Sequence, residues 1–189
     1  LKKHGYYIVS PVTTNAPSGR RWMDKFRRIC PDVWSSIDAA AVHFYDTDTD
    51  KFKKYVSHWH NRYNKPIWVT EYACQDFNGG QQCSDTDAHG FHTEMASWFD
   101  NQDFVEAYAP FGVMRDLQGV AQSNSLMSEG SPNSLFSDIV SDDWSIDTST
   151  PLLCNRAVAP DAVYSIVHSK IPTVISAATN HKELMYTMY

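Results

Sequence analysis

A glutamate stands at the end of an apolar segment in the middle of the chain, at position 71. Glu71 follows Ile67-Trp68-Val69-Thr70, whose β-branched and aromatic residues indicate a strand that Pro66 opens. In parallel-sheet enzymes the reacting groups lie at the carboxyl ends of strands, so Glu71 is placed to act on a substrate. The alternative is a carboxylate in a salt bridge at a barrel rim. Gln75 and Asp76 follow closely and fit either substrate contact or a solvated loop.

Other strand ends also carry side chains suited to a site. His43 and Tyr45 are two residues apart, so they share one face of a strand. Asn15 ends the polar exit of the first expected strand, and Phe111 lies at the end of the last one. We therefore expect a common mouth at the carboxyl ends of the strands.

Three aspartates imitate the start of a calcium-binding loop, at positions 46, 48 and 50. Lys51 and Ser57 stand where such a loop needs a glycine and a glutamate. We therefore expect a solvated loop and a helix cap here, and no metal.

Histidines and cysteines give no metal pattern either. His58 and His60 are two apart on a helix and point to different faces, and for His89, His92 and Glu94 we expect a hydrated surface. The four cysteines contain no C-x2-C spacing, which disfavours a zinc site. Cys74 and Cys83 flank a short glycine-containing loop, so a disulfide and two free thiols both stay open. We predict no cofactor.

Four apolar segments supply the expected strands. They are Tyr6–Val9, Ala39–Tyr45, Ile67–Thr70 and Val105–Phe111, and their starts are about 30 to 40 residues apart, the length of a βα unit. This alternation predicts an α/β fold with a parallel sheet, either doubly wound or part of a (β/α)8 barrel. No glycine-rich nucleotide motif follows the first strand, which leaves a nucleotide-binding sheet without support.

Amphipathic helices are expected between the strands. The clearest begins at Asp50 as its cap. Its apolar stripe consists of Phe52, Tyr55, Val56, Trp59 and Tyr63. An earlier helix carries Trp22, Phe26 and Ile29. A later helix carries Ala88, Phe91, Met95, Trp98 and Phe99. A further short helix is expected around Leu135.

Composition narrows the class of partner. The chain has 189 residues, is 42% hydrophobic and carries a net charge of −6, which argues against nucleic acid, because phosphate binding needs a basic face. No apolar run approaches the roughly 20 residues that cross a bilayer, so we expect no membrane span. The start at residues 1–5 is typical of a helix end, so we expect the chain to continue a larger protein. Residues 145–189 form a tail that the βα pattern does not assign.

Residues 1 to about 136 resemble the fungal glycosyl hydrolase catalytic core proteins, glycoside hydrolase family 128. The motifs that carry the resemblance are Ser10–Pro17, Asp38–Tyr45 and Lys65–Gln75, which are specific jointly and in this order. The resemblance implies a β-1,3-glucanase with a (β/α)8 barrel, of which the four strands would be the fifth to eighth. Residues 1–144 would then be the C-terminal half of the catalytic domain, and its substrate a β-glucan polysaccharide of the cell wall, where such proteins are secreted.

The same resemblance assigns roles to residues. Glu71 matches the nucleophile of this retaining family, and His43 and Tyr45 match residues that hold it and line the sugar subsite. Asn15 and Phe111 are implied to bind substrate. A retaining glycosidase also needs a protonated carboxyl about 5 to 5.5 Å from the nucleophile.

Two departures from the family pattern matter. The family's acid/base lies in an Asn-Glu pair, which occurs nowhere in this chain, and Pro110 stands where relatives have an aromatic residue. We therefore expect the chain to hydrolyse glucan little or not at all, and its half-barrel edges to allow self-association. A non-catalytic glucan-binding module and a truncated product without its own function remain alternatives.

Overall fold

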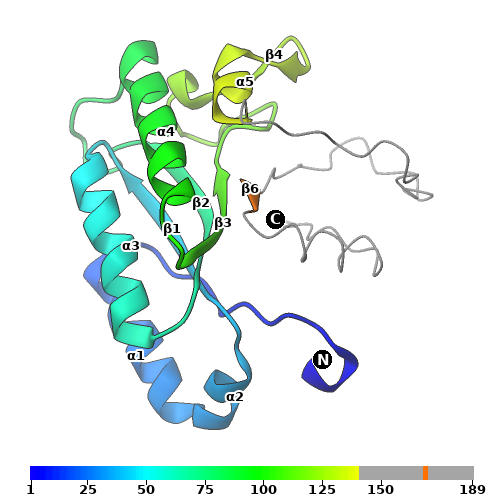
Figure 1. Ribbon diagram of the computed structural model, residues 1–189. Helices are drawn as coiled ribbons and strands as arrows, with labels where there is room; N and C mark the ends of the chain where they lie inside the picture. Colours follow the sequence, from blue (N-terminus) through cyan, green and yellow to red (C-terminus); the bar gives the residue numbers. More distant parts are fainter. Residues whose placement is uncertain (141–167, 170–189) are drawn as a thin grey trace, which may run out of the picture.

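The computed structural model describes residues 1–140 and 168–169. The chain has an α/β fold that is built on a four-stranded sheet. Its strands are β1 (Ala40–Asp46), β2 (Ile67–Cys74), β3 (Val105–Pro110) and β6 (His168–Ser169), in the order β1-β2-β3-β6. The first three run parallel, which confirms the expected parallel sheet (Figure 1). The strand β6 adds an antiparallel pairing at Ala107 and Tyr108 that the βα pattern did not predict. The rest of the tail expected at 145–189 lies outside the described residues.

The prediction of a strand at Tyr6–Val9 is wrong. Only Val9 forms a bridge, parallel to Ala39. The carboxylate of Asp38, which pairs with Lys2, accepts the backbone N–H of Ile8 at 2.7 Å, whereas the carbonyl of Ile8 still accepts the N–H of Asp38. The preceding residues 2–4 form one 3₁₀ turn, η1, which ends at Gly5 with φ +82°, the helix end that the sequence indicates.

Two long helices follow β1 and β2 as expected. They are α3 (Thr49–Tyr63) and α4 (Asp85–Asp100). Asp48, not Asp50, caps α3, because its side chain accepts the N–H of Lys51 at 2.9 Å. Ser84 and Asp87 form a reciprocal capping box at the start of α4.

The apolar stripe expected for the first helix is confirmed at Phe26, which packs against the main core, and is wrong at Trp22 and Ile29. The helix α1 (Pro17–Ile29) buries Gly19 and Met23, whereas Trp22 and Ile29 are 48% and 59% exposed. A Cβ on Gly19 would lie 2.1 Å from the carbonyl oxygen of Thr14, so the close approach of that loop decides which face of α1 is buried.

Short elements complete the described chain. A helix was expected around Leu135 and is found as α5 (Ser134–Val140), with Leu135 buried. The sequence did not predict the others, which are α2 (Pro31–Ser36), η2 (Gln122–Asn124), β4 (Met127–Ser128) and β5 (Ser131–Pro132).

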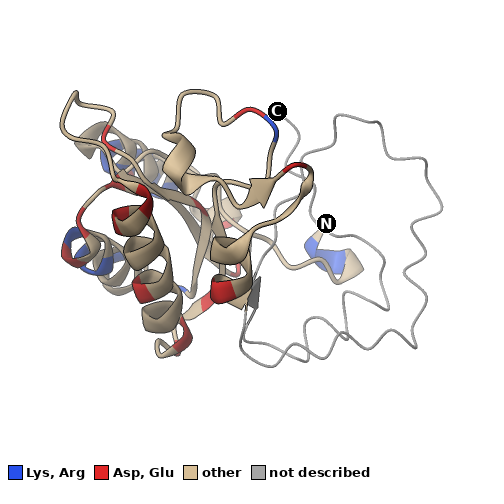
Figure 2. Cartoon of the chain, turned by 90° about the horizontal axis from the view of Figure 1, so that it is seen from above, with Lys and Arg blue, Asp and Glu red and all other residues tan. Residues whose placement is uncertain are grey.

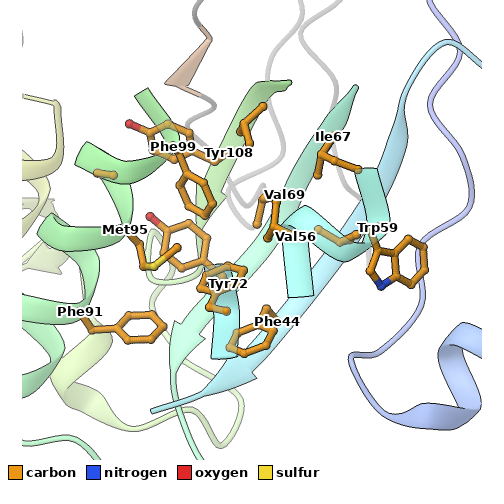
Figure 3. Packing of buried hydrophobic residues seen from close by; sticks show 14 of the residues in the cluster. Phe44, Val56, Trp59, Ile67, Val69, Tyr72, Phe91, Met95, Phe99 and Tyr108 are labelled. Atoms are coloured by element: carbon orange, nitrogen blue, oxygen red, sulfur yellow. The ribbon is translucent and has the colours of Figure 1, made fainter. Parts of the chain in front are cut away.

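The main core lies between the sheet and the helices α3 and α4, which cover the same face of the sheet (Figure 1). Aromatic rings dominate it, with Phe44 and Phe52 stacked at 4.1 Å between ring centres and Tyr72 and Phe99 beside them. Figure 3 shows buried side chains converging from the strands, such as Phe44 and Tyr72, and from the two helices, such as Val56 and Phe99. Full burial of each such side chain stabilises the fold by about 1.5–3 kcal/mol.

Charged residues are dispersed over the surface. Lys and Arg occur in small groups, one of them the turn η1, with Asp and Glu between them (Figure 2). Among the described residues, no helix combines the length and apolar character that crossing a membrane requires.

Candidate active site

Glu71 and His43 face each other across two parallel strands. The Nδ1 atom of His43 lies 2.7 Å from Oε2 of Glu71, and their side chains are only 18% and 15% exposed. The register explains the contact: Val42 lies opposite Val69, but a shift after Val42 places His43 opposite Glu71 instead of Thr70. A local irregularity of the β1–β2 ladder therefore makes the pair.

This pair fixes the orientation of the carboxylate. An ionised carboxylate only accepts hydrogen bonds, so with Glu71 ionised the Nδ1 atom of His43 carries the hydrogen. Such a charge-assisted hydrogen bond holds the carboxylate in one orientation, and partial exposure leaves it accessible.

The other predicted residues gather at the same end of the sheet. The Nδ2 atom of Asn15 donates to the carbonyl oxygen of Tyr45 at 3.2 Å, so it ties the loop before α1 to the end of β1. The ring of Tyr45 meets Phe111 edge-on at 6.2 Å and Phe77 edge-on at 5.2 Å. Phe77 was missed, and its place in a polar, glycine-containing loop offers no sequence signal.

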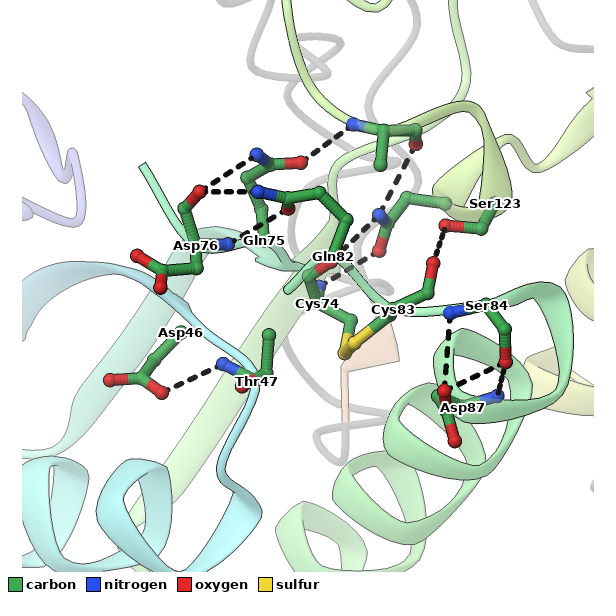
Figure 4. The surroundings of a disulfide bond; sticks show 12 residues. Asp46, Thr47, Cys74, Gln75, Asp76, Gln82, Cys83, Ser84, Asp87 and Ser123 are labelled. Carbon is green, nitrogen blue, oxygen red and sulfur yellow. Dashed lines mark hydrogen bonds between the residues drawn. A yellow bond between two sulfur atoms is a disulfide. The ribbon is translucent and has the colours of Figure 1, made fainter. Parts of the chain in front are cut away.

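A disulfide between Cys74 and Cys83 closes the loop between β2 and α4 (Figure 4). Of the two alternatives that the sequence left open for these cysteines, the disulfide is therefore the one found. Inside it, the carboxylate of Asp76 accepts the N–H groups of Asn78 and Gly80 at 2.6 and 3.0 Å. The pKa of Asp76 is lowered, and the hydrogen bond from the Asn78 N–H is the largest cause. Asp76 thus organises its own loop.

Gln75 and Gln82 complete the hydrogen bonding of this loop. Gln82 bonds both the backbone N–H and the carbonyl of Asp76, at 3.1 and 2.6 Å. Gln75 is buried and accepts the N–H of Ala121 at 2.6 Å, so it links the loop to the segment after β3 and is not solvated.

A buried histidine supports the end of β2 from behind. His92 is fully buried, and the expected hydrated surface is wrong for this residue. Its Nε2 lies 3.0 Å from Oδ1 of Asn124, which also accepts the N–H of Cys74 at 2.8 Å. Burial lowers the pKa of His92 to about 4, so the ring is neutral near pH 7. His89 and Glu94 do lie at the surface, paired with Asp138 and Lys53.

The residues that imitate a calcium loop have local roles. The carboxylate of Asp46 accepts the N–H groups of Thr47 and Asp48, and Asp48 caps α3. His60 bonds the carbonyl of Lys65 at 2.9 Å. Within residues 1–140 and 168–169, no three His, Cys, Asp or Glu side chains are grouped to hold a metal ion.

A second carboxylate, that of Glu106, lies on the same side of the sheet as Glu71 but closer to the amino ends of the strands. Glu106 accepts hydrogen bonds from Nε1 of Trp68, at 3.0 Å, and from the hydroxyl of Tyr7. Because Trp68 pairs with Ala107, Glu106 lies about three residues below Glu71, or about 10 Å along the strands.

Comparisons with known proteins agree on one family. The model of the glycosyl hydrolase catalytic core family matches residues 1–138. Alkali-sensitive linkage protein 1 of Schizosaccharomyces pombe is 31% identical over 123 residues, which are 65% of this chain and 22% of that protein.

Solved structures give the same answer. An exo-β-1,3-glucanase of glycoside hydrolase family 128, subgroup V, from Cryptococcus neoformans matches with a TM-score of 0.65 and 27% identity, over 72% of this chain and 55% of that one. A glutamate-to-alanine variant of a subgroup I endo-β-1,3-glucanase from Amycolatopsis mediterranei, in complex with laminaritriose and laminaribiose, matches with a TM-score of 0.62 and 26% identity, over 73% and 59%. This chain therefore spans little more than half of these structures and about a fifth of the curated relative.

Proposed function

The chain belongs to the glycosyl hydrolase catalytic core family, and on that premise we propose that it is the nucleophile-bearing half of a retaining β-1,3-glucan hydrolase. The observation that carries the proposal is the contact between His43 and Glu71 at the carboxyl end of the parallel strands. In this proposal residues 1–144 are the C-terminal half of a (β/α)8 barrel, in which the segment ending at the Val9 bridge takes the place of strand five and β1, β2 and β3 are strands six to eight. A β-glucan of the cell wall is the substrate, met by a secreted protein.

The reaction would begin with Glu71. Its carboxylate oxygen forms a bond to the anomeric carbon of the sugar, while the bond from that carbon to the leaving oxygen breaks with its electron pair. His43 holds the carboxylate in one orientation, and Asn15, Tyr45 and Phe111 hold the sugar at the rim. A second carboxyl must protonate the leaving oxygen of a natural glucan.

No described glutamate is placed to be that acid. Glu106 lies about 10 Å below Glu71 along the strands, twice the separation of about 5 Å that a retaining pair needs. Glu94 lies on α4, and Glu129 lies between β4 and β5. We therefore propose that the 189-residue chain by itself hydrolyses laminarin little or not at all.

A substrate with a leaving group that needs no protonation isolates the first step. We expect 2,4-dinitrophenyl 2-deoxy-2-fluoro-β-laminaribioside to react with the chain, releasing dinitrophenolate and leaving a glycosyl ester on Glu71. Mass spectrometry of the digested chain detects the adduct. Glu71→Gln should abolish labelling, and Glu94→Gln should keep it.

Two outcomes would contradict the proposal. Labelling of another residue, or none at all, would refute Glu71 as the nucleophile. Laminarin hydrolysis by the chain that is lost in Glu71→Gln would show that an acid is present and would refute the proposed impairment.

The edge-on rings of Tyr45, Phe77 and Phe111 favour a second candidate, a non-catalytic glucan-binding module. It predicts retention on insoluble β-1,3-glucan without any adduct on Glu71. Self-association through sheet edges is a further part of the proposal, and light scattering on a size-exclusion column tests it by the measured mass.

A further inference from the structure

Phe77 is the most exposed aromatic side chain among the described residues, at 60%. It lies in the loop of residues 75–82 and belongs to neither apolar cluster of the described chain. Its ring contacts Tyr45, edge-on at 5.2 Å, and Tyr45 in turn contacts Phe111. Phe77 therefore extends the aromatic rings of the candidate site, Tyr45 and Phe111, with a face that is open to a ligand.

The loop holds this ring in a defined place. The disulfide between Cys74 and Cys83 fixes both ends of the loop, one at the end of β2 and the other before α4. Asp76, the neighbour of Phe77, is bonded to the backbone N–H groups of Asn78 and Gly80, and a Cβ on Gly80 would lie 2.1 Å from the Asp76 carboxylate. A ring on such a loop loses little freedom when a ligand binds.

We propose that Phe77 is the stacking platform of an additional sugar subsite for β-1,3-linked gluco-oligosaccharides. Every ring substituent of β-glucose is equatorial, so each face of the sugar presents C–H groups that pack on an aromatic ring, while the hydroxyls point sideways into water. This inference rests on the proposed function, because it takes the glucan as the ligand of the same site.

The subsite is distinct from the one at Glu71. Tyr45 is two residues beyond His43 on β1, or about 7 Å further along the strand, and Phe77 contacts the ring of Tyr45. The sugar over Phe77 is therefore a different unit from the one that Glu71 attacks. A long oligosaccharide fills both places, whereas a disaccharide bound at Glu71 has only one further unit to offer.

The disulfide makes this subsite dependent on redox state. Reduction removes the covalent closure of the loop that presents Phe77, whereas the pair of His43 and Glu71 lies within the β1–β2 ladder. We infer that reduction weakens the binding of long oligosaccharides selectively.

Calorimetric titration of the oxidised 189-residue chain with laminarihexaose and laminaribiose tests the inference. Phe77→Ala should weaken laminarihexaose binding about tenfold, in the range for truncated aromatic anchors, and should weaken laminaribiose binding less. Phe77→Trp should restore the affinity. Trp22→Ala is the matched control, because Trp22 is also an exposed aromatic residue, but lies on α1. Equal thermal unfolding midpoints show that the variants are folded.

The outcomes separate this inference from the proposed function. If the chain binds laminarihexaose and Phe77→Ala binds it equally well, the subsite is refuted and the proposed function stands. If the chain binds neither sugar, both are refuted. Treatment with a phosphine reductant should weaken hexaose binding by the unsubstituted chain toward that of Phe77→Ala and leave the variant unchanged; an unaltered affinity would refute the role of the disulfide.

Discussion

The two faces of the central sheet differ in what they hold. On the face under α3 and α4, Phe44 and Tyr72 are at most 3% exposed and pack on rings from the helices. On the opposite face, His43, Glu71 and Trp68 are only partly buried, and each has a polar partner. The same strands supply both sets, because successive side chains of a strand point to opposite faces.

This alternation separates stability from chemistry. In β1, Val42 and Phe44 enter the core while His43 and Tyr45, between and after them, meet the site. A substitution can therefore alter one face with little effect on the other. Measurements on matched variants can test whether the two faces are as independent as the structure indicates.

The largest effect is expected for Phe52→Ala in α3. Phe52 is fully buried and its ring contacts Phe44, Tyr72 and Phe99. Truncation leaves a cavity that these rings cannot fill, so we expect the free energy of unfolding to fall by about 3–5 kcal/mol. Urea denaturation followed by circular dichroism measures it. Lys54→Ala, exposed on the same helix, should change it by less than about 0.5 kcal/mol. Equal losses would show that the packed face does not carry the stability.

The sequence predicts the packed face well where the apolar stripe of a helix extends over several turns. The stripes of α3 and α4 cover about four turns each, and even their less buried members, Tyr55 and Trp98, pack against the core. The stripe expected for α1 holds at Phe26 and fails at Trp22 and Ile29, because the approach of a loop to Gly19 shifts the buried face, and no periodicity encodes that contact.

The candidate site is predictable only in part. A carboxylate at a strand end and the spacing of His43 and Tyr45 point to it, but the register shift that brings His43 level with Glu71 leaves no mark in the sequence. Phe77 and His92 depend on contacts between distant segments, through Tyr45 and Asn124, so reading along the chain could not find them.

His92 is the exception on the packed face, because it is a titratable group within an apolar layer. Its folded-state pKa of about 4 lies below the ordinary value of 6.5, so the unfolded chain binds more protons between these values. Its contribution is fully present above pH 6.5 and is lost as the pH falls toward 4. We expect the free energy of unfolding to drop between pH 7 and 4.5 by about 2 kcal/mol more in the unsubstituted chain than in His92→Gln, which keeps a donor for Asn124.

Chemical denaturation at a series of pH values measures this difference. His89→Gln is the matched control, since His89 lies on the same helix in a half-exposed pair with Asp138, and it should leave the pH dependence nearly unchanged. Parallel curves for the unsubstituted chain and His92→Gln would show that the packed face tolerates the charge and would weaken the distinction between the two faces.

The smallest effect is expected on the open face, for Trp68→Phe. The substitution removes the hydrogen bond from Nε1 to Glu106 and keeps an aromatic ring to stack on Tyr7. Because Glu106 is partly exposed and still accepts from the Tyr7 hydroxyl, water can replace the lost donor, and we expect a loss of about 1 kcal/mol or less in urea denaturation. Labelling of Glu71 should continue unchanged, since Trp68 lies three residues below it on β2. A loss as large as that of Phe52→Ala would mean that the open face is a second core, and that stability and chemistry share it.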